Sequence, residues 1–348
     1  MVSSQANNQH SINVKEYIAG ALTKVPKNDL EQALLRSGWP RVTIEKYFSQ
    51  VPKEGDQKNS ILSLNNISKK YDRKTVLSNV SFTVYKKDLL GILGVTGSGK
   101  TTLLHIIAGV LSPTNGSVTK LTSLGISPQN PALHEHLTAK ENIEHFAREY
   151  NIKNGSQKVD DLLKLVKLFD DKDTKVEDMS SGMKKRLDVA CAIVHDPQVL
   201  ILDEPLADID PVARRTLWDI LKKINGSGTT ILLTSHLVDE LSQHCSRIAV
   251  LKAGRLIDLG TIEDLRGVYT KNFEVHIKCD NMKLLLSNIP KENITNTFEK
   301  DGCTIFATSD TNALAELLLN ESKKLNVHIE YLSIQQPTLS QVFEDVVS

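Results

Sequence analysis

The sequence predicts an α/β fold with a mostly parallel central sheet. Three short apolar runs, "LLGILG", "VLILDE" and "TTILLTSH", have the continuous apolarity of strands that are buried on both faces. Segments with helical periodicity alternate with these runs between residues 61 and 267. A glycine-rich turn follows the first run directly, at the strand end where open parallel sheets hold their ligands.

Residues 1–58 are predicted to form a small three-helix bundle followed by a linker. Apolar residues recur at helical spacing over 14–22, "NDLEQALLRSG" has a capping box and a terminal glycine, and Pro40 is placed to open a third helix. The polar stretch "VPKEGDQKNS" is typical of a linker. The run "LEQALLRSGWPRVTIEKYF" resembles ubiquitin-associated (UBA-like) modules, in which Trp39 would be either a core residue or an exposed recognition residue.

Residues 59–267 carry the central sheet and, before it, two strands with alternating polarity. "ILSLNNISKKY" and "VSFTVYK" alternate as half-buried antiparallel strands do. "IAVLKAGRLIDLG" predicts a hairpin that turns at Ala253 and Gly254. We therefore expect an antiparallel β flank beside the parallel sheet.

The turn "GVTGSGKTT" fits the pattern G-x-x-x-x-G-K-[ST] of loops that hold nucleotide phosphates. Its glycines let the backbone approach an anion, and successive amides form a concave nest at the start of the helix "TTLLHIIAGVL". Lys100 would reach the β- and γ-phosphates, and Thr101 would ligate Mg²⁺. The predicted nucleotide-binding residues of this turn are Gly94, Gly97, Ser98, Gly99, Lys100, Thr101 and Thr102. The alternative is a strand-turn-helix connection that fits the pattern by chance.

Four further stretches follow the phosphate loop in order. "SPQN" places Gln129 in a loop after a strand, and "MSSGMKKRL" is a small-residue turn that opens a helix, hence a second anion site. "VLILDEP" places Asp203 and Glu204 at the end of a buried strand, where one can hold Mg²⁺ and the other can polarise a water molecule. "TSH" places His236 at the end of another strand.

Together, "GVTGSGKTT", "SPQN", "MSSGMKKRL", "LILDEP", "ADID" and "TSH" resemble the nucleotide-binding subunits of ATP-binding-cassette (ABC) transporters over about 200 residues. The resemblance implies a P-loop NTPase core with an antiparallel β flank and a helical subdomain. It also implies ATP and Mg²⁺ as cofactors.

The resemblance implies a role for each matching position. Tyr71 would stack on adenine, although a strand-end aromatic that packs on the flank is the alternative. Gln129 would contact Mg²⁺ and the attacking water, with Thr101 and Asp203 as the other metal ligands. Glu204 would be the catalytic carboxylate and His236 the residue that contacts the γ-phosphate. Ser180 and Gly182 would close over the γ-phosphate of a second ATPase subunit, expected to be an identical copy arranged head to tail.

Two positions depart from the family pattern, which has glycine where this chain has Ser181 and Asp208. A Cβ at residue 181 is expected to crowd the backbone turn or the phosphate of the partner subunit. The stretch "HEH" at residues 134–136 lacks the spacing of a zinc-binding helix, so we do not expect a metal there.

Residues 268–348 are predicted to form a small α+β appendage with the order strand, helix, strand, helix, strand. The segment closes with "PTLSQVFEDVV", in which Pro337 is placed to open a final helix. The ending "IQQPTLSQVFEDV" resembles the tail of daunorubicin-type exporter ATPases, whose permeases are separate chains. This resemblance favours export.

Composition narrows the classes of partner. The 348 residues include 42 Lys and Arg against 42 Asp and Glu, so no basic surplus points to nucleic acid. The four cysteines are widely spaced and are expected to be reduced thiols. No apolar stretch approaches the roughly 20 residues of a membrane span. We expect a cytoplasmic subunit that binds the inner face of the cell membrane through its permease.

The sequence therefore predicts the ATP-hydrolysing subunit of an ABC exporter. The alternative is a soluble ABC-type ATPase that acts as a switch or assembly factor on protein partners, which the UBA-like module makes conceivable. A small GTPase is excluded because the chain has no N-K-x-D motif.

Overall fold

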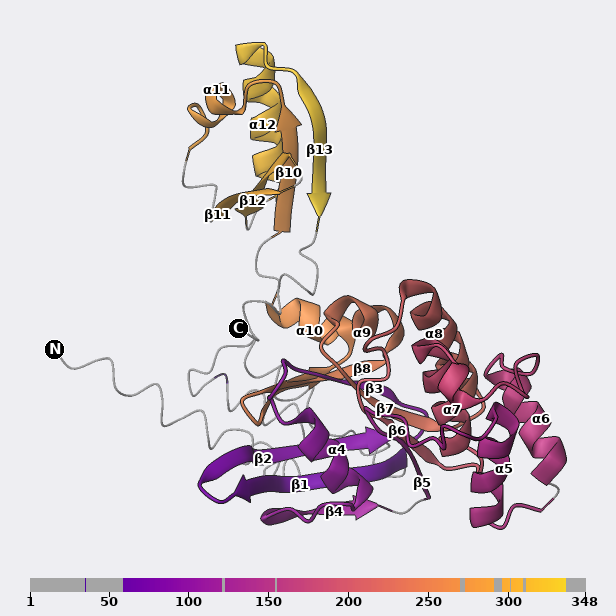
Figure 1. Ribbon diagram of the computed structural model, residues 1–348. Helices are drawn as coiled ribbons and strands as arrows, with labels where there is room; N and C mark the ends of the chain where they lie inside the picture. The colour runs from indigo at the N-terminus through magenta and orange to yellow at the C-terminus, as the bar shows by residue number, and fades with distance from the viewer. Residues whose placement is uncertain are drawn as a thin grey trace.

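The structure, a computed structural model, describes residues 35, 59–120, 123–153, 155–269, 273–290, 296–300, 302–308 and 311–335 (Figure 1). Apart from residue 35, the predicted N-terminal helices lie outside these residues, as do the linker before residue 59 and the final helix at Pro337.

A six-stranded sheet forms the centre of the fold, with the order β5-β6-β7-β3-β8-β9. All neighbouring strands pair in parallel except β8 and β9, which confirms the predicted mostly parallel sheet. Every residue of β3, β6 and β7 is buried, as the continuous apolar runs predict. The strands are β3 (Leu89–Leu93), β5 (Leu124–Ser127), β6 (Val199–Leu202), β7 (Thr230–Ser235), β8 (Arg247–Lys252) and β9 (Arg255–Gly260).

The predicted hairpin between β8 and β9 is confirmed. Lys252 pairs with Arg255, so Ala253 and Gly254 form a two-residue loop. Both have positive φ, 47° and 75°, which is the geometry that matches the twist of the flanking strands.

A separate three-stranded antiparallel sheet forms the flank, with the order β2-β1-β4. Its strands are β1 (Ser60–Tyr71), β2 (Lys74–Tyr85) and β4 (Asn115–Lys120). β2 begins at Lys74, well before the predicted run at Val80, because a tight turn at Asp72 lets Tyr71 pair directly with Lys74. The longer hairpin extends the flank to the edge of the site described below.

Helices flank the central sheet, some packed directly on it and some on another helix (Figure 1). They are α4 (Lys100–Ala108), α5 (Ala139–Glu149), α6 (Gly155–Leu165), α7 (Ser181–Ala192), α8 (Pro211–Gly226), α9 (Val238–His244) and α10 (Ile262–Tyr269), with a 3-10 turn at Val176–Asp178. α4 ends at Ala108, earlier than the predicted helix "TTLLHIIAGVL", because Gly109 adopts a left-handed φ of 80° and caps it. Asp210 caps α8 by accepting hydrogen bonds from the backbone N–H groups of Val212 and Ala213.

Two hydrophobic cores lie on the two faces of the central sheet. One contains apolar residues of α5 to α8, and the other contains residues of the antiparallel flank and α4. β6 contributes to both, because Leu200 and Leu202 belong to the first core while Val199 and Ile201 belong to the second.

Residues 273–335 form a four-stranded antiparallel sheet with two helices and a core that includes Val275, Phe306 and Leu318. Its elements are β10 (Phe273–Cys279), α11 (Met282–Leu286), β11 (Asn296–Lys300), β12 (Cys303–Thr308), α12 (Thr311–Leu325) and β13 (Ile329–Gln335). β11 is absent from the predicted order. Its sequence "NTFEK" has too little apolar alternation to signal a strand, and it is held by the hairpin with β12.

Candidate active site

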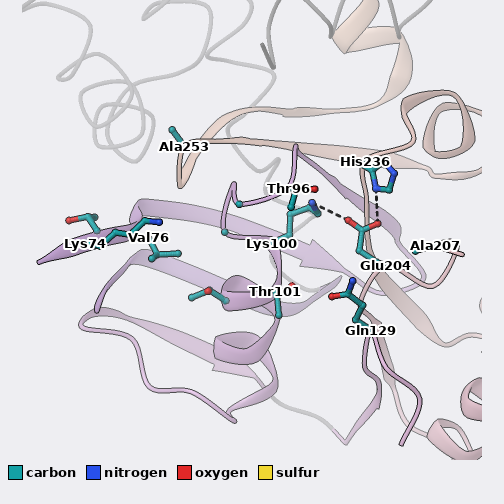
Figure 2. A pocket seen from close by; sticks show the side chains of 14 residues that line it. Lys74, Val76, Thr96, Lys100, Thr101, Gln129, Glu204, Ala207, His236 and Ala253 are labelled. Carbon is teal, nitrogen blue, oxygen red and sulfur yellow. Dashed lines mark hydrogen bonds and ion pairs between the residues drawn. The ribbon is translucent and has the colours of Figure 1, made fainter. Parts of the chain in front are cut away.

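A pocket of about 550 Å³ opens where the antiparallel flank meets the carboxyl ends of the central strands (Figure 2). A volume of this size falls in the range of small-molecule sites. The pocket is lined by Lys74, Thr75, Val76, Thr96, Gly97, Gly99, Lys100, Thr101, Thr102, Gln129, Glu204, Ala207, His236 and Ala253. Residues that the sequence singled out in four separate motifs therefore meet in one place.

Glycine is required at two positions of the phosphate loop by what surrounds them. Gly99 has a φ of 104°, and a Cβ there would lie 2.8 Å from a methyl group of Leu77. A Cβ on Gly94 would lie 2.5 Å from the carbonyl oxygen of Leu251. The side chain of Ser98 is buried under the loop, and its hydroxyl has no hydrogen-bond partner within the described residues. Gly94 and Ser98 thus shape the loop from beneath and do not line the pocket.

Lys100 is folded back into the loop. Its ammonium group donates to the carbonyl oxygens of Gly94 at 2.8 Å and Val95 at 3.2 Å, and it lies 3.0 Å from Oε1 of Glu204. The side chain is only 7% exposed. A cation held at the mouth of a ring of backbone amides is suited to bind an oligophosphate.

Thr234 orients the two adjacent carboxylates, and sequence reasoning missed it. Its hydroxyl donates to Oδ1 of Asp203 at 2.6 Å and accepts from the backbone N–H of Glu204 at 2.8 Å. Glu204 has a φ of 46°, an unfavourable conformation for a residue with a Cβ, which the surrounding contacts maintain. The only sequence signal for Thr234 is its place before "SH" at the end of a strand adjacent to β6.

His236 and Gln129 complete the wall around Glu204 (Figure 2). Nδ1 of His236 lies 3.2 Å from Oε2 of Glu204, so the carboxylate contacts Lys100 on one side and His236 on the other. Gln129 comes from the loop after β5 and is exposed to the pocket. These groups surround a space in which a water molecule could be oriented against a bound phosphate.

Six predicted residues lie outside the pocket lining: Gly94 and Ser98 beneath the loop, Asp203 beside Glu204, and Tyr71, Ser180 and Gly182 elsewhere in the chain. Tyr71 is 43% exposed at the end of β1, and the Nζ atom of Lys69 lies over its ring, 5.2 Å from the ring centroid. Ser180 is exposed and caps α7, accepting a hydrogen bond from the backbone N–H of Met183 at 3.3 Å. Gly182 is buried against α8, where a Cβ would lie 2.8 Å from Cβ of Ala213. The pocket of one chain is thus formed without the turn at Ser180.

The two departures from the family pattern contact each other. The hydroxyl of Ser181 donates to the backbone carbonyl of Asp208 at 2.9 Å. Asp208 has a φ of 58°, a left-handed conformation that aspartate tolerates better than most residues and glycine tolerates best. The backbone therefore keeps the conformation that a glycine would adopt, and the serine hydroxyl joins the turn before α7 to the loop after β6.

The donor set fits a magnesium nucleotide better than a protein-bound metal. Within the described residues there is no group of three or more His, Cys, Asp or Glu side chains placed to hold a metal ion. Mg²⁺ bound with a nucleotide usually takes one or two protein oxygens and completes its shell with phosphates and water. Thr101, Gln129 and Asp203 offer oxygens of that kind.

A buried charged pair on α7 fixes the loop that carries Gln129. The ammonium of Lys185 donates to the backbone carbonyl of Gln129, and Oδ2 of Asp188 accepts from the hydroxyl of Ser127. Burial lowers the pKa of Lys185 and raises the pKa of Asp188, and each charge opposes the shift of the other. The sequence analysis interprets only the turn that opens this helix and does not identify Lys185 or Asp188.

The comparisons with known proteins agree with this geometry. Residues 77–207 match the family described as "ABC transporter". The chain is 29% identical over 301 residues to the linearmycin resistance ATP-binding protein LnrL of Bacillus subtilis (strain 168), covering 81% of this chain and 97% of that protein. It is 36% identical over 213 residues to the Nod factor export ATP-binding protein I of Rhizobium leguminosarum bv. viciae, covering 57% of this chain and 68% of that protein.

Coverage of the relatives varies. The chain spans 61% and 64% of the length of two other Nod factor export ATP-binding proteins, from Sinorhizobium fredii and Rhizobium meliloti. Among solved structures, the dimeric ATP-binding cassette MJ0796 in a post-hydrolysis state with ADP and Pi is similar, with a TM-score of 0.53 and 25% identity. That comparison covers 58% of this chain and 99% of MJ0796.

Proposed function

Because this chain belongs to the ABC transporter family and is an ABC ATPase, we propose that it is the ATP-hydrolysing subunit of an exporter and drives a separate membrane-spanning permease. The names of two relatives, which refer to Nod factor export and linearmycin resistance, support export as the direction of transport. Within the described residues no helix is both long and apolar enough to cross a membrane, so the proposal assigns the transport path to another chain.

The proposed chemistry is in-line attack of water on the γ-phosphoryl group, which needs positioning and charge neutralisation. Lys100 would leave Glu204 and contact the β- and γ-phosphates. Thr101, Gln129 and Asp203 would hold Mg²⁺, whose charge neutralises phosphate oxygens. Glu204 would accept a proton from the attacking water, and His236 would contact the γ-phosphate.

The observation that carries the proposal is the division of the predicted site into two parts. The pocket gathers the phosphate loop, Gln129, Glu204 and His236, while Ser180 lies on an exposed turn outside it. A second copy placed head to tail would bring that turn over the γ-phosphate. The dimeric structure of MJ0796 supports a working dimer.

The proposal extends to both ends of the chain. We assign residues 59–267 to the ATPase domain and residues 268–348 to an α+β appendage, which the sheet of β10 to β13 supports. Residues 1–58 would be a UBA-like module and linker. The subunit would work in the cytoplasm, bound to the inner face of the membrane through its permease.

The test is the Glu204→Gln substitution in the full chain. The variant keeps the size and hydrogen-bonding capacity of the side chain, so ATP binding should persist while turnover falls by about 10² or more, the scale of a lost general base. ATP should then drive dimerisation, measured by light scattering at several protein concentrations. Adding Lys100→Ala should abolish the dimer.

Three outcomes would contradict the proposal. Hydrolysis by Glu204→Gln at the wild-type rate would remove Glu204 from the chemistry. An inactive variant that binds ATP and stays monomeric, even after extraction with its membrane partners, would exclude the head-to-tail dimer. Purification of the full chain from native membranes without any multi-span partner would favour a soluble switch.

A further inference from the structure

Helix α7 is joined to the loop after β5 by two buried side chains. The ammonium of Lys185 donates to the backbone carbonyl of Gln129. Asp188 accepts from the hydroxyl of Ser127 with one oxygen and from the backbone N–H of Ala132 with the other, at 3.2 Å. The chain is therefore held at the last residue of β5, at Gln129 and again at Ala132.

The two side chains act from one face of the helix. Lys185 and Asp188 are three residues apart, a spacing that places side chains next to each other on a helix surface. Both are nearly buried, with exposures of 7% and 3%. Buried charges are costly unless they are paired and hydrogen-bonded, and here the loop supplies the hydrogen-bond partners. The contact is consequently a specific attachment and not a chance approach of two surface groups.

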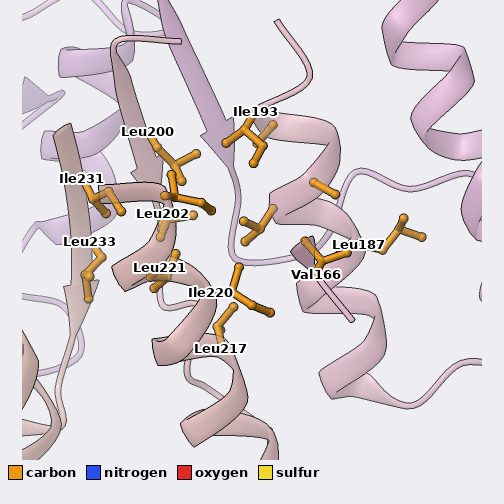
Figure 3. Packing of buried hydrophobic residues seen from close by; sticks show 14 of the residues in the cluster. Val166, Leu187, Ile193, Leu200, Leu202, Leu217, Ile220, Leu221, Ile231 and Leu233 are labelled. Carbon is orange, nitrogen blue, oxygen red and sulfur yellow. The ribbon is translucent and has the colours of Figure 1, made fainter. Parts of the chain in front are cut away.

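The opposite side of α7 is fixed by apolar packing. Leu187 belongs to the core that also contains Leu217 and Leu221 of α8 (Figure 3). A close-packed helix moves as a unit because its side chains have few alternative positions. A displacement of α7 would therefore carry the attached loop with it.

The end of β5, from which this loop leaves, also contacts Asp203, the neighbour of the pocket residue Glu204. The backbone carbonyl of Ser127 accepts a hydrogen bond from the N–H of Asp203 at 3.0 Å. At the other end of the connection, Ser180 caps α7 about 7 to 8 Å from Lys185, given the rise of 1.5 Å per residue in a helix. α7 thus links the turn at Ser180 to the loop of Gln129 within one chain.

We propose that Lys185 and Asp188 are positioning residues, which hold Gln129 where it serves hydrolysis and couple its placement to the N-terminus of α7. This inference rests on the proposed function, since it takes Gln129 as a ligand of the hydrolysis site and Ser180 as a contact of the partner subunit's nucleotide. Closure of the dimer on Ser180 then sets the position of Gln129 in the same chain.

The test measures ATP hydrolysis and ATP binding separately in the full chain. Lys185→Met removes the donor and keeps the apolar stem, while Asp188→Asn keeps the shape and removes the charge. Each should lower kcat by about tenfold, a scale typical of misplaced reacting groups, and leave the ATP dissociation constant without Mg²⁺ within about twofold. Lys184→Met, one position away on α7, is the matched control and should leave both quantities unchanged.

A Gln129→Ala background distinguishes positioning from general stabilisation. With Gln129 truncated there is no amide left to position, so neither substitution should lower kcat further by more than about twofold. Hydrolysis is followed with γ-labelled ATP so that slow rates stay measurable. A residue that only stabilises the fold would lower kcat equally in both backgrounds and would lower the melting temperature.

Three results would overturn the inference: a kcat equal to that of Lys184→Met, a loss of kcat that follows a loss of nucleotide affinity, or a full effect in the Gln129→Ala background. If one variant does not fold, the other decides. Glu204→Gln measured alongside separates the two proposals. Should Glu204→Gln be inactive while Lys185→Met and Asp188→Asn are normal, only the positioning role fails; should Glu204→Gln be fully active, the proposed function fails.

Discussion

The ammonium of Lys100 lies 3.0 Å from the carboxylate of Glu204, and both side chains are almost buried, at 7% and 11% exposure. These two groups have separate proposed tasks, one on the phosphates and one on the attacking water. The other hydrogen bonds of Lys100 go to carbonyl oxygens of its own loop. A phosphate must therefore compete with Glu204 for the same cation.

This competition predicts that Glu204→Gln binds ATP more tightly than the wild type when Mg²⁺ is withheld. Loss of the ion pair should lower the dissociation constant by about two- to tenfold, or up to about 1.4 kcal/mol. Titration calorimetry in EDTA measures it. Glu263→Gln, which removes the charge of an exposed carboxylate outside the pocket, is the control. Weaker binding by Glu204→Gln would mean that the carboxylate holds the nucleotide directly.

Tyr71 is the predicted adenine contact that the pocket lining does not include. If it stacks on the base, Tyr71→Ala should weaken ATP binding by about 1 to 3 kcal/mol, the range for base-aromatic stacking. Tyr331→Ala removes a tyrosine of nearly equal exposure from β13 and should have no effect. Unchanged affinity of Tyr71→Ala in calorimetry would leave Tyr71 as a packing residue of the flank.

Gly182→Ala is expected to destabilise the chain although alanine favours helices. The helix propensity gain is about 1 kcal/mol, whereas overpacking costs about 1 to 3 kcal/mol, and the new Cβ would lie 2.8 Å from that of Ala213. In an Ala213→Gly background the sign should reverse. Urea unfolding of the wild type, the two single variants and the double variant measures the coupling between the two positions. If Gly182→Ala destabilises both backgrounds equally, the contact with Ala213 is excluded as the cause.

The sequence could predict the parts of the site that depend on local patterns. The phosphate loop, the strand ends at Asp203 and His236 and the hairpin at Ala253 each follow from residues that are adjacent in the chain. Thr234, Lys185 and Asp188 could not be found this way, because their partners lie across the sheet or on another element. β11 was missed because a neighbouring strand, and not its own apolar pattern, holds it in the sheet.

Asp210 predicts a pH dependence of stability. The hydrogen bond from the N–H of Ala213, the largest cause, lowers the pKa of this carboxyl. A lowered pKa in the folded chain means that the contribution is present above the ordinary pKa of about 3.9 and is lost as the pH falls through the folded value. The stability difference between the wild type and Asp210→Asn should be constant from about pH 8 to 5 and should shrink below about pH 4.

Urea unfolding at each pH measures this difference. Asp219→Asn removes a carboxylate from the same helix without touching its cap, so it controls for net charge. A difference that grows as the pH falls would contradict the assigned sign.

Deletion of residues 1–58 tests whether the N-terminal segment belongs to the ATPase. β1 begins at Ser60 and none of the pocket residues precedes it. Basal hydrolysis should stay within about threefold, because the deletion removes no group that positions the reactants or neutralises their charge. Loss of a protein partner is the expected effect, seen by co-purification. A folded truncation that no longer binds ATP would place the segment inside the catalytic unit.

Successive residues of β6 belong to the hydrophobic cores on opposite faces of the sheet, so this strand separates the two cores. Substitution of Leu200 or Leu202 would loosen the side that carries α7, whereas substitution of Val199 or Ile201 would loosen the side that carries the phosphate-loop helix α4. Amide hydrogen exchange after such substitutions should thus show protection lost on one side first. A chain built this way can undergo local unfolding of α5 to α8 while the phosphate-loop helix on the other face of the sheet stays folded.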